Sequence, residues 1–174
     1  MISTAVILDP KERVLAQWGQ SQAALPGHGL AWLKSRRRGA INRFEELGFP
    51  TEKIESWRFT PVTSLTLKPF VLAQGAPQGF KPEGLALAKF DAYRLLFING
   101  RHVPDPENPL PQGASLGSLV AFLEDRPQQL EPYLARFKAN AFAALNSAFF
   151  TDGAVLHLAP GVRLEKPVHL MFAT

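Results

Sequence analysis

Cysteine is absent from the 174-residue sequence. Its absence excludes disulfide bonds, thiolate nucleophiles and thiolate-ligated metal sites from anything that these residues build alone. Long apolar runs are absent too, because no run approaches the roughly 18 residues that cross a bilayer as a helix. Residues 1–8 lack the basic segment and cleavage site of a secretory signal. These absences predict a soluble, cytoplasmic protein with no membrane segment.

Sequence templates of common enzyme classes are also missing. The chain contains no P-loop, GxGxxG or HExxH pattern, which leaves nucleotide-binding and zinc-protease functions without support. Carboxylate pairs occur at Glu45 and Glu46, on an expected helix end, and at Asp105 and Glu107, in an expected loop. Neither place supplies the separated, differently tuned carboxylates of a glycosidase. We therefore predict that the chain is not an enzyme and contains no catalytic or cofactor-binding residue.

The histidines are candidate metal ligands, because imidazole is the commonest metal ligand in proteins. They are His28, His102, His157 and His169. His157 and His169 lie on expected strands and could approach one another, but no cysteine or paired carboxylate completes a ligand set. We predict ordinary surface or strand-stacking histidines and no metal site.

The sequence does have the composition of a globular protein, with 46% hydrophobic and 20% charged residues. Its formal charge is +4, and the densest basic cluster is Lys34, Arg36, Arg37 and Arg38. Apolar residues recur at helical spacing over residues 30–47, so most of this cluster is expected on the solvent face of a helix. A basic nucleic-acid-binding module stays an alternative, although no recognised nucleic-acid motif accompanies the charge.

Helical patterns dominate the first third of the chain. Asp9-Pro10 fits a helix start, and an apolar stripe follows it. A second helix over residues 30–47 is expected to stop at Gly48, which can adopt a left-handed cap. Apolar spacing later predicts short helices over residues 116–123, 130–137 and 140–150.

Strand patterns occur at several places. Residues 93–98 lead through Asn99-Gly100 into residues 101–103, and the Asn-Gly pair suits a type I′ hairpin turn. Shorter extended pieces are expected at residues 65–67 and 70–72. Strands expected at residues 154–158, 162–164 and 168–172, separated by tight corners, have the pattern of one coil of a β-solenoid.

A single solenoid coil cannot hide its apolar face, because roughly three stacked repeats are needed. The sequence stops in or just after the last expected strand. One expectation is that the chain is the truncated front of a longer protein. The other is that the last strands pair with another chain, for example in a homodimer, because an unpaired edge invites pairing.

Three segments carry a family resemblance, in order along the chain. Residues 48–61, GFPTEKIESWRFTP, resemble a Pro-Thr-x-x-x-Glu-x-Trp-Lys/Arg-Tyr-Thr-Pro element, with Phe59 in place of the tyrosine. Residues 96–104, LFINGRHVP, resemble a hairpin that precedes a second helical stretch. Residues 144–154, ALNSAFFTDGA, and residues 160–170, PGVRLEKPVHL, resemble the approach to a β-helix. Together these segments resemble the SufB/SufD family of iron-sulfur cluster assembly scaffolds.

The resemblance implies an α+β fold. A helical amino-terminal domain with a small β-hairpin, residues 1–150, would lead into the first coil of a right-handed parallel β-helix, residues 151–174. The long helical start is more similar to SufD than to SufB. The family's residues for cluster assembly and SufC docking lie in later segments, so the resemblance carries no such residue onto this chain.

The resemblance also implies a function. It implies a non-catalytic scaffold subunit of the SUF machinery, in complex with SufB-like and SufC-like subunits, of which the SufC-like one is an ATPase. No cofactor is implied within this chain, because the parent complex handles the iron-sulfur cluster. A β-helix polysaccharide-active enzyme with a helical preface stays the alternative.

Two motifs within these segments have both a structural and a functional interpretation. Glu55, Trp57 and Arg58 could form a recognition site, because tryptophan beside charges is common in interfaces. We expect instead that Trp57 fills the join between helices and sheet while Glu55 and Arg58 fix the turn. The Asp152-Gly153 pair is expected to form a turn and to need no catalytic role.

Overall fold

The protein is seen in a computed structural model that describes residues 9–73, 75, 90–104, 109–136 and 140–174. The chain divides into two compact units, and each unit is assembled from two stretches of chain. The first comprises Met1–Val71 and Glu131–Phe150, and the second comprises Leu72–Leu130 and Thr151–Thr174. The division into domains 1–150 and 151–174 stays a prediction, because these units are clusters of contacts rather than separately tested domains.

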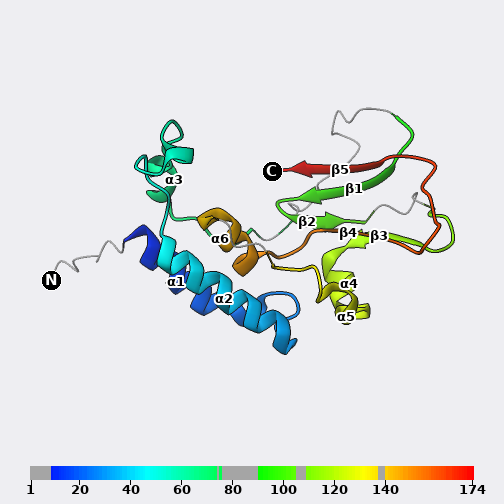
Figure 1. The fold of residues 1–174 in the computed structure, drawn as a ribbon, viewed down its shortest axis with the longest axis horizontal. Coiled ribbons are helices and arrows are strands. Elements are labelled where there is room, and N and C mark those ends of the chain that lie inside the picture. The colour runs from blue at the N-terminus through cyan, green and yellow to red at the C-terminus, as the bar shows by residue number, and fades with distance from the viewer. Residues whose placement is uncertain (1–8, 74, 76–89, 105–108, 137–139) are drawn as a thin grey trace. The chain divides into compact units, whose positions relative to one another are not determined.

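The first unit is helical. Its α-helices and short 3₁₀ turns (η) are α1 (Pro10–Ser21), η1 (Gln22–Ala24), α2 (Ala31–Leu47), η2 (Glu55–Trp57), α3 (Thr63–Thr66) and α6 (Ala141–Phe149) (Figure 1). Helix α2 packs mainly against α6 and also contacts α1. The unit is therefore built around α2.

The core of the helical unit lies between α2 and α6. Its buried members are Ala40, Ile41 and Phe44 from α2, and Ala141, Ala144 and Ala148 from α6. In each helix these residues are spaced three or four apart or adjacent, which places them on one face. The alanines let the two backbones approach closely, and the Phe44 ring meets the edge of Phe49 at 5.1 Å between centroids.

The two long helices begin and end close to the predicted residues. Helix α1 has Pro10 in its first turn, where the missing N–H costs nothing. Helix α2 ends at Leu47, and Gly48 follows with a φ of 63°. The Gly48 N–H donates to the Phe44 carbonyl, so the predicted helix end at this glycine is confirmed. Its ψ of −174° lies outside the left-handed helical region that was expected.

The second unit combines two small sheets with two short helices. Its elements are β1 (Tyr93–Ile98), β2 (Arg101–Val103), β3 (Ala114–Ser118), α4 (Leu119–Asp125), α5 (Pro127–Leu130), β4 (Ala154–Leu158) and β5 (Val168–Ala173) (Figure 1). One sheet has the strand order β2-β1-β5, and the other is the pair β3-β4.

The central strand β1 is paired on both sides. Strands β1 and β2 form the predicted hairpin, with antiparallel pairing of Ile98 and Arg101. Asn99 and Gly100 both have positive φ, 49° and 74°, as a type I′ turn requires. On the other side β1 runs parallel to β5, with Tyr93 opposite Val168.

Several shorter elements differ from the predictions. The expected extended piece at residues 65–67 is instead the end of the helical turn α3. Leu116, expected on a helix, lies on β3, because the Ser118 hydroxyl caps the helix and α4 begins only at Leu119. The expected helix over residues 130–137 is helical only at Leu130, where α5 ends, and residue 137 lies outside the described residues.

The predicted α+β class is confirmed, whereas the β-helix part of the prediction is not. Of the three strands expected for a coil, β4 and β5 form, but residues 162–164 are irregular. Strand β4 pairs with β3, and β5 pairs with β1. The described residues therefore contain no complete three-stranded coil.

Candidate functional site

The feature of the second unit that most resembles a binding surface is the apolar face of β5. Leu170 is 44% exposed and Phe172 is 67% exposed, whereas Met171 between them is buried at 8%. Because side chains alternate across a strand, Leu170 and Phe172 share one face. Phe172 stacks on the buried Phe97 of β1, with ring centroids 5.0 Å apart and an interplanar angle of 15°.

The same strand also has an open backbone edge. Among the described strands, β5 has β1 as its neighbour on one side and none on the other (Figure 1). An edge strand presents unpaired N–H and C=O groups to any strand that can align with it. We call this edge together with Leu170 and Phe172 the β5 surface. It can accept a further strand and cover that strand's apolar side chains.

The two-stranded sheet β3-β4 also exposes apolar side chains. On β4, Leu156 is 46% exposed and Leu158 is 38% exposed. Between them lies His157, which is exposed as well. Strand β4 is therefore not covered on either face to the extent that β1 is, and it too has apolar side chains available for packing.

Asp152 connects the segments that position these sheets. Its Oδ2 accepts a hydrogen bond from the His102 N–H of β2 at 3.0 Å. Its Oδ1 accepts from the Ser118 hydroxyl at 2.9 Å and from the Val120 N–H of α4 at 3.2 Å. Oδ1 also accepts from the adjacent Gly153 N–H at 2.8 Å. The carboxylate therefore holds an irregular segment in front of β4, and the turn expected at Asp152-Gly153 is not formed. These contacts give Asp152 a structural role in the second unit.

Trp57 packs within the helical unit. Its ring lies 5.2 Å from the ring of Phe142 on α6. Glu55 and Arg58 are exposed, and the Arg58 N–H donates to the Glu55 carbonyl at 3.3 Å. The packing interpretation of Trp57 is confirmed for its helical side, while the turn is fixed by backbone rather than by the Glu55 and Arg58 side chains.

The histidines are distributed over separate elements. His28 and His157 are exposed, and His102 and His169 are half-buried. His157 lies on β4 and His169 on β5, which belong to different sheets. The His169 ring lies 4.8 Å from that of Phe90. Within the described ranges, no group of three or more His, Cys, Asp or Glu residues is arranged to hold a metal ion.

The basic cluster of α2 is divided between the surface and the interior. Lys34 and Arg38 are exposed as predicted. Arg37 is only 4% exposed, so the prediction of a solvent face is wrong for this residue. Arg36 is half-buried, and its Nη1 donates to the Leu134 carbonyl at 2.9 Å and to the Glu131 carbonyl. A continuous basic face for nucleic acid is therefore not present on this helix.

Arg37 is held at the end of the helical unit by backbone and aromatic contacts. Its Nη2 donates to the carbonyls of Pro26 and Phe150, at 3.0 and 3.1 Å. The guanidinium carbon lies 4.1 Å from the centroid of the Phe150 ring. Burial disfavours the charged form and lowers the pKa of Arg37 to about 10.

Sequence spacing contained a signal for this buried arginine. Arg37 follows Leu33 by four residues and precedes Ile41 by four, and both of these are buried. Residues four apart share a face of a helix. The position of Arg37 therefore pointed to the interior, while its charged neighbours pointed to solvent.

No helix among the described residues is both long enough and apolar enough to cross a membrane.

Comparison with known proteins gives consistent matches. A family model described as SufBD protein N-terminal region matches residues 9–170. An iron-sulfur cluster assembly SufBD family protein of Synechocystis sp. is 30% identical over 160 residues, which cover 89% of this chain and 35% of that protein. The iron-sulfur cluster assembly protein SufD of Escherichia coli (strain K12) is 32% identical over 127 residues, which cover 73% of this chain and 28% of that protein. The chain thus spans about a third of the length of these relatives.

Proposed function

Because the chain belongs to the SufBD family, through its amino-terminal region, we propose that it is the front part of a SufD-like scaffold for iron-sulfur cluster assembly. Both relatives named above are iron-sulfur cluster assembly proteins. The proposed role is non-catalytic. The cluster is handled by the parent complex, in which SufB-like and SufC-like subunits are the partners.

The observation that supports this role in the structure is the β5 surface. Strand β5 runs parallel to β1, and parallel pairing is also the pairing between successive coils of a parallel β-helix. We propose that the exposed edge of β5 and the side chains of Leu170 and Phe172 are covered by later strands of a β-helix.

A co-purification experiment tests the function. The full-length parent protein, carrying an affinity tag, is co-expressed with its SufB-like and SufC-like subunits and purified through the tag. A stable three-component complex is expected. If neither subunit co-purifies under conditions in which the tagged protein is folded, the proposed scaffold role is wrong.

A second copy of the chain is the other candidate to cover the β5 surface. Size-exclusion chromatography with light scattering separates the two cases. If the full-length protein is a homodimer that dissociates when Phe172 is changed to serine, the surface serves self-association. If it enters the three-component complex without passing through a homodimer, the β-helix proposal is supported.

A further inference from the structure

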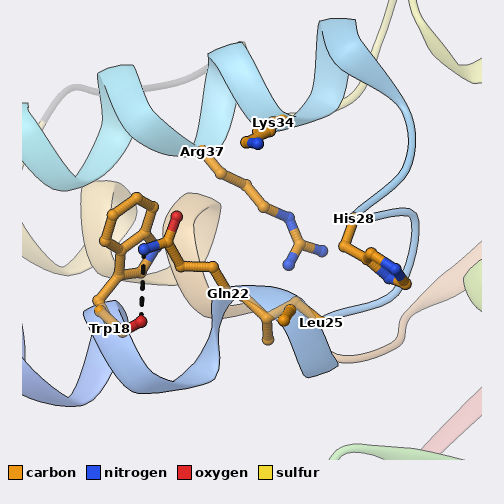
Figure 2. Close-up of a pocket in the computed structure, with 8 residues that line it drawn as sticks. Trp18, Gln22, Leu25, His28, Lys34 and Arg37 are labelled. Atoms are coloured by element: carbon orange, nitrogen blue, oxygen red, sulfur yellow. Dashed lines mark hydrogen bonds between the residues drawn. The ribbon is translucent and has the colours of Figure 1, made fainter.

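A cavity lies in the helical unit where the end of α1 and η1 face the first turns of α2 (Figure 2). Its volume is about 270 Å³. The residues that matter for its chemistry are Trp18, Gln22, Leu25, His28, Lys34 and Arg37. Pockets for drug-sized ligands are usually about 300–1,000 Å³, so this cavity suits a smaller molecule.

The cavity contains buried hydrogen-bond donors that the protein does not use. Arg37 is 4% exposed, yet its Nε and Nη1 have no hydrogen-bond partner among the described residues. The indole Nε1 of Trp18 is likewise buried and without a partner there. The great majority of buried hydrogen-bond donors in proteins have a partner. Two buried side chains with unused donors at one cavity therefore call for an explanation.

The charge in the cavity has one sign. Figure 2 shows the Arg37 side chain crossing from α2 toward Leu25 and His28, with its guanidinium inside the site. Lys34 contributes a second cation, and no carboxylate is among the residues that line the cavity. A buried guanidinium without a counter-ion is unfavourable, and an anion that enters the cavity would remove this cost.

The rest of the lining is apolar. Trp18, Ala23 and Leu25 offer an aromatic face and aliphatic carbon beside the cationic groups. Such a combination distinguishes an organic acid from an inorganic ion, because the apolar part of the ligand gains contact while its charged end meets the arginine.

We propose that this cavity binds a small organic anion, a carboxylate carried on a short apolar or aromatic body. The carboxylate accepts hydrogen bonds from the unpaired N–H groups of Arg37, and Lys34 strengthens the positive field at the mouth. The body of the ligand packs against Trp18 and Leu25. The site is independent of the scaffold role, since it lies wholly in the helical unit.

Sodium benzoate is the probe for the test, and the indole N–H signals of the three tryptophans are the readout. The ¹⁵N-labelled chain is titrated at constant ionic strength, and Trp18→Phe identifies the Trp18 signal. A saturable shift of this signal is expected, with a Kd on the order of 1 mM. Benzamide, which has the same shape without the charge, and inorganic phosphate, which lacks the apolar body, are each expected to bind at least about tenfold more weakly.

Matched variants locate the site. Arg37→Met should weaken benzoate binding by about tenfold or more, because it removes the buried charge and its hydrogen-bond donors and keeps an unbranched side chain. Arg38→Met, which changes the net charge equally at an exposed position of the same helix, should leave the Kd unchanged. Equal binding of benzoate by wild type and Arg37→Met would overturn the proposal.

A third variant covers the case in which Arg37→Met does not fold. Lys34 is exposed at the cavity, so Lys34→Met is not expected to disturb the helix, but it should weaken benzoate binding by roughly two- to fivefold. An unchanged Kd in this variant, or no shift of the Trp18 signal in wild type up to about 50 mM benzoate, would show that the cavity is not an anion site.

Discussion

At the scale of single residues, Asp152 joins three segments of the second unit through its carboxylate. Its two carboxylate oxygens accept hydrogen bonds from β2, from the residue that caps α4 and from α4 itself. A hydrogen bond to a charged group contributes about 1.5–3 kcal/mol, and a donor left without its acceptor costs about 1–3 kcal/mol. The three segments therefore depend on one side chain.

Asp152→Ala is expected to lower the free energy of unfolding by about 2–4 kcal/mol, because the His102 N–H and the Ser118 hydroxyl lose the carboxylate as an acceptor and the Val120 N–H keeps only the Ser118 hydroxyl. Denaturant titration followed by circular dichroism measures this change. Asp125→Ala is the control, since Asp125 is exposed and, within the described part of the chain, forms an ion pair with the neighbouring Arg126 at 2.8 Å. The control should change stability by less than about 1 kcal/mol. Equal effects of the two substitutions would contradict the role assigned to Asp152.

Arg37 shows how far single residues could be predicted from the sequence. The helix that carries it was predicted correctly, but Arg37 was expected with its charged neighbours on the solvent face, although its spacing from Leu33 and Ile41 fits the buried face. Its partners could not be predicted, because the Pro26 and Phe150 carbonyls come from distant parts of the sequence. The cavity beside Arg37 depends on the same tertiary packing, so no local sequence pattern indicated the cavity.

At the scale of elements, the β1–β2 turn requires a backbone conformation that favours glycine. Gly100 has a φ of 74°, a conformation in which an L side chain costs roughly 1–2 kcal/mol. Gly100→Ala should therefore destabilise the chain by about that amount, as measured by thermal and denaturant unfolding. Gly29→Ala is the control, because a Cβ there meets nothing within 4 Å. A Gly100→Ala variant as stable as the Gly29→Ala variant would show that the turn tolerates another geometry.

The contact between α2 and α6 makes a second prediction at this scale. Ala144 is fully buried at 0% exposure in that contact. Ala144→Leu should lower the free energy of unfolding by about 1–3 kcal/mol, since added methylenes force closely packed helices apart. Ala16→Leu adds the same atoms at an exposed position of α1.

The control substitution Ala16→Leu should leave stability within about 0.5 kcal/mol of wild type. Chemical denaturation of both variants side by side distinguishes the two positions. If Ala144→Leu is tolerated as well as Ala16→Leu, then α6 does not pack on α2 as closely as described.

Elements with a long periodic pattern were predicted well, and short ones were not. Helices α1, α2 and α6 and the β1–β2 hairpin match because periodicity or turn chemistry determines them locally. Strand β3 was missed because five residues with Gly117 in their midst have little intrinsic strand preference. It forms through its pairing with β4, a partner more than thirty residues away. Tertiary pairing of this kind is not visible in a local window.

At the scale of the whole molecule, the β5 surface is exposed in this chain and, in our proposal, is covered in the full-length protein. Phe172 is 67% exposed, and Leu67, on the first unit, is exposed to nearly the same extent at 69%. If later strands cover β5 in the parent protein, Phe172→Ser should destabilise the full-length protein by about 1.5–3 kcal/mol, the value of burying a phenylalanine side chain. In the 174-residue chain the cost should be smaller.

Leu67→Ser is the matched control for this prediction. It should cost less than about 1 kcal/mol in both lengths of protein. Unfolding of the four proteins, followed by intrinsic fluorescence and circular dichroism, gives the comparison. The same small effect of Phe172→Ser in both lengths would mean that no further strand covers β5.

The family and the α+β class could be predicted from the sequence, because the three resembling segments span most of the chain from residue 48 onward. The division of the chain into two units could not be predicted from the sequence. Residues 131–150 return to the first unit after residues 72–130 have entered the second, and nothing in local composition marks that return. Contacts between residues far apart in the sequence decide which unit residues 131–150 join.

That division also determines the order in which the protein can fold as it leaves the ribosome. Helix α2 is complete at Leu47, but its main packing partner α6 ends at Phe149, about a hundred residues later. At translation rates of roughly 5–20 residues per second, the apolar face of α2 waits about 5–20 s for its partner. During that interval β1 is made as well, and it waits in turn for β5. Both halves of the nascent chain thus carry unpaired apolar surface at once, which makes this segment a natural client for chaperones that shield emerging polypeptides.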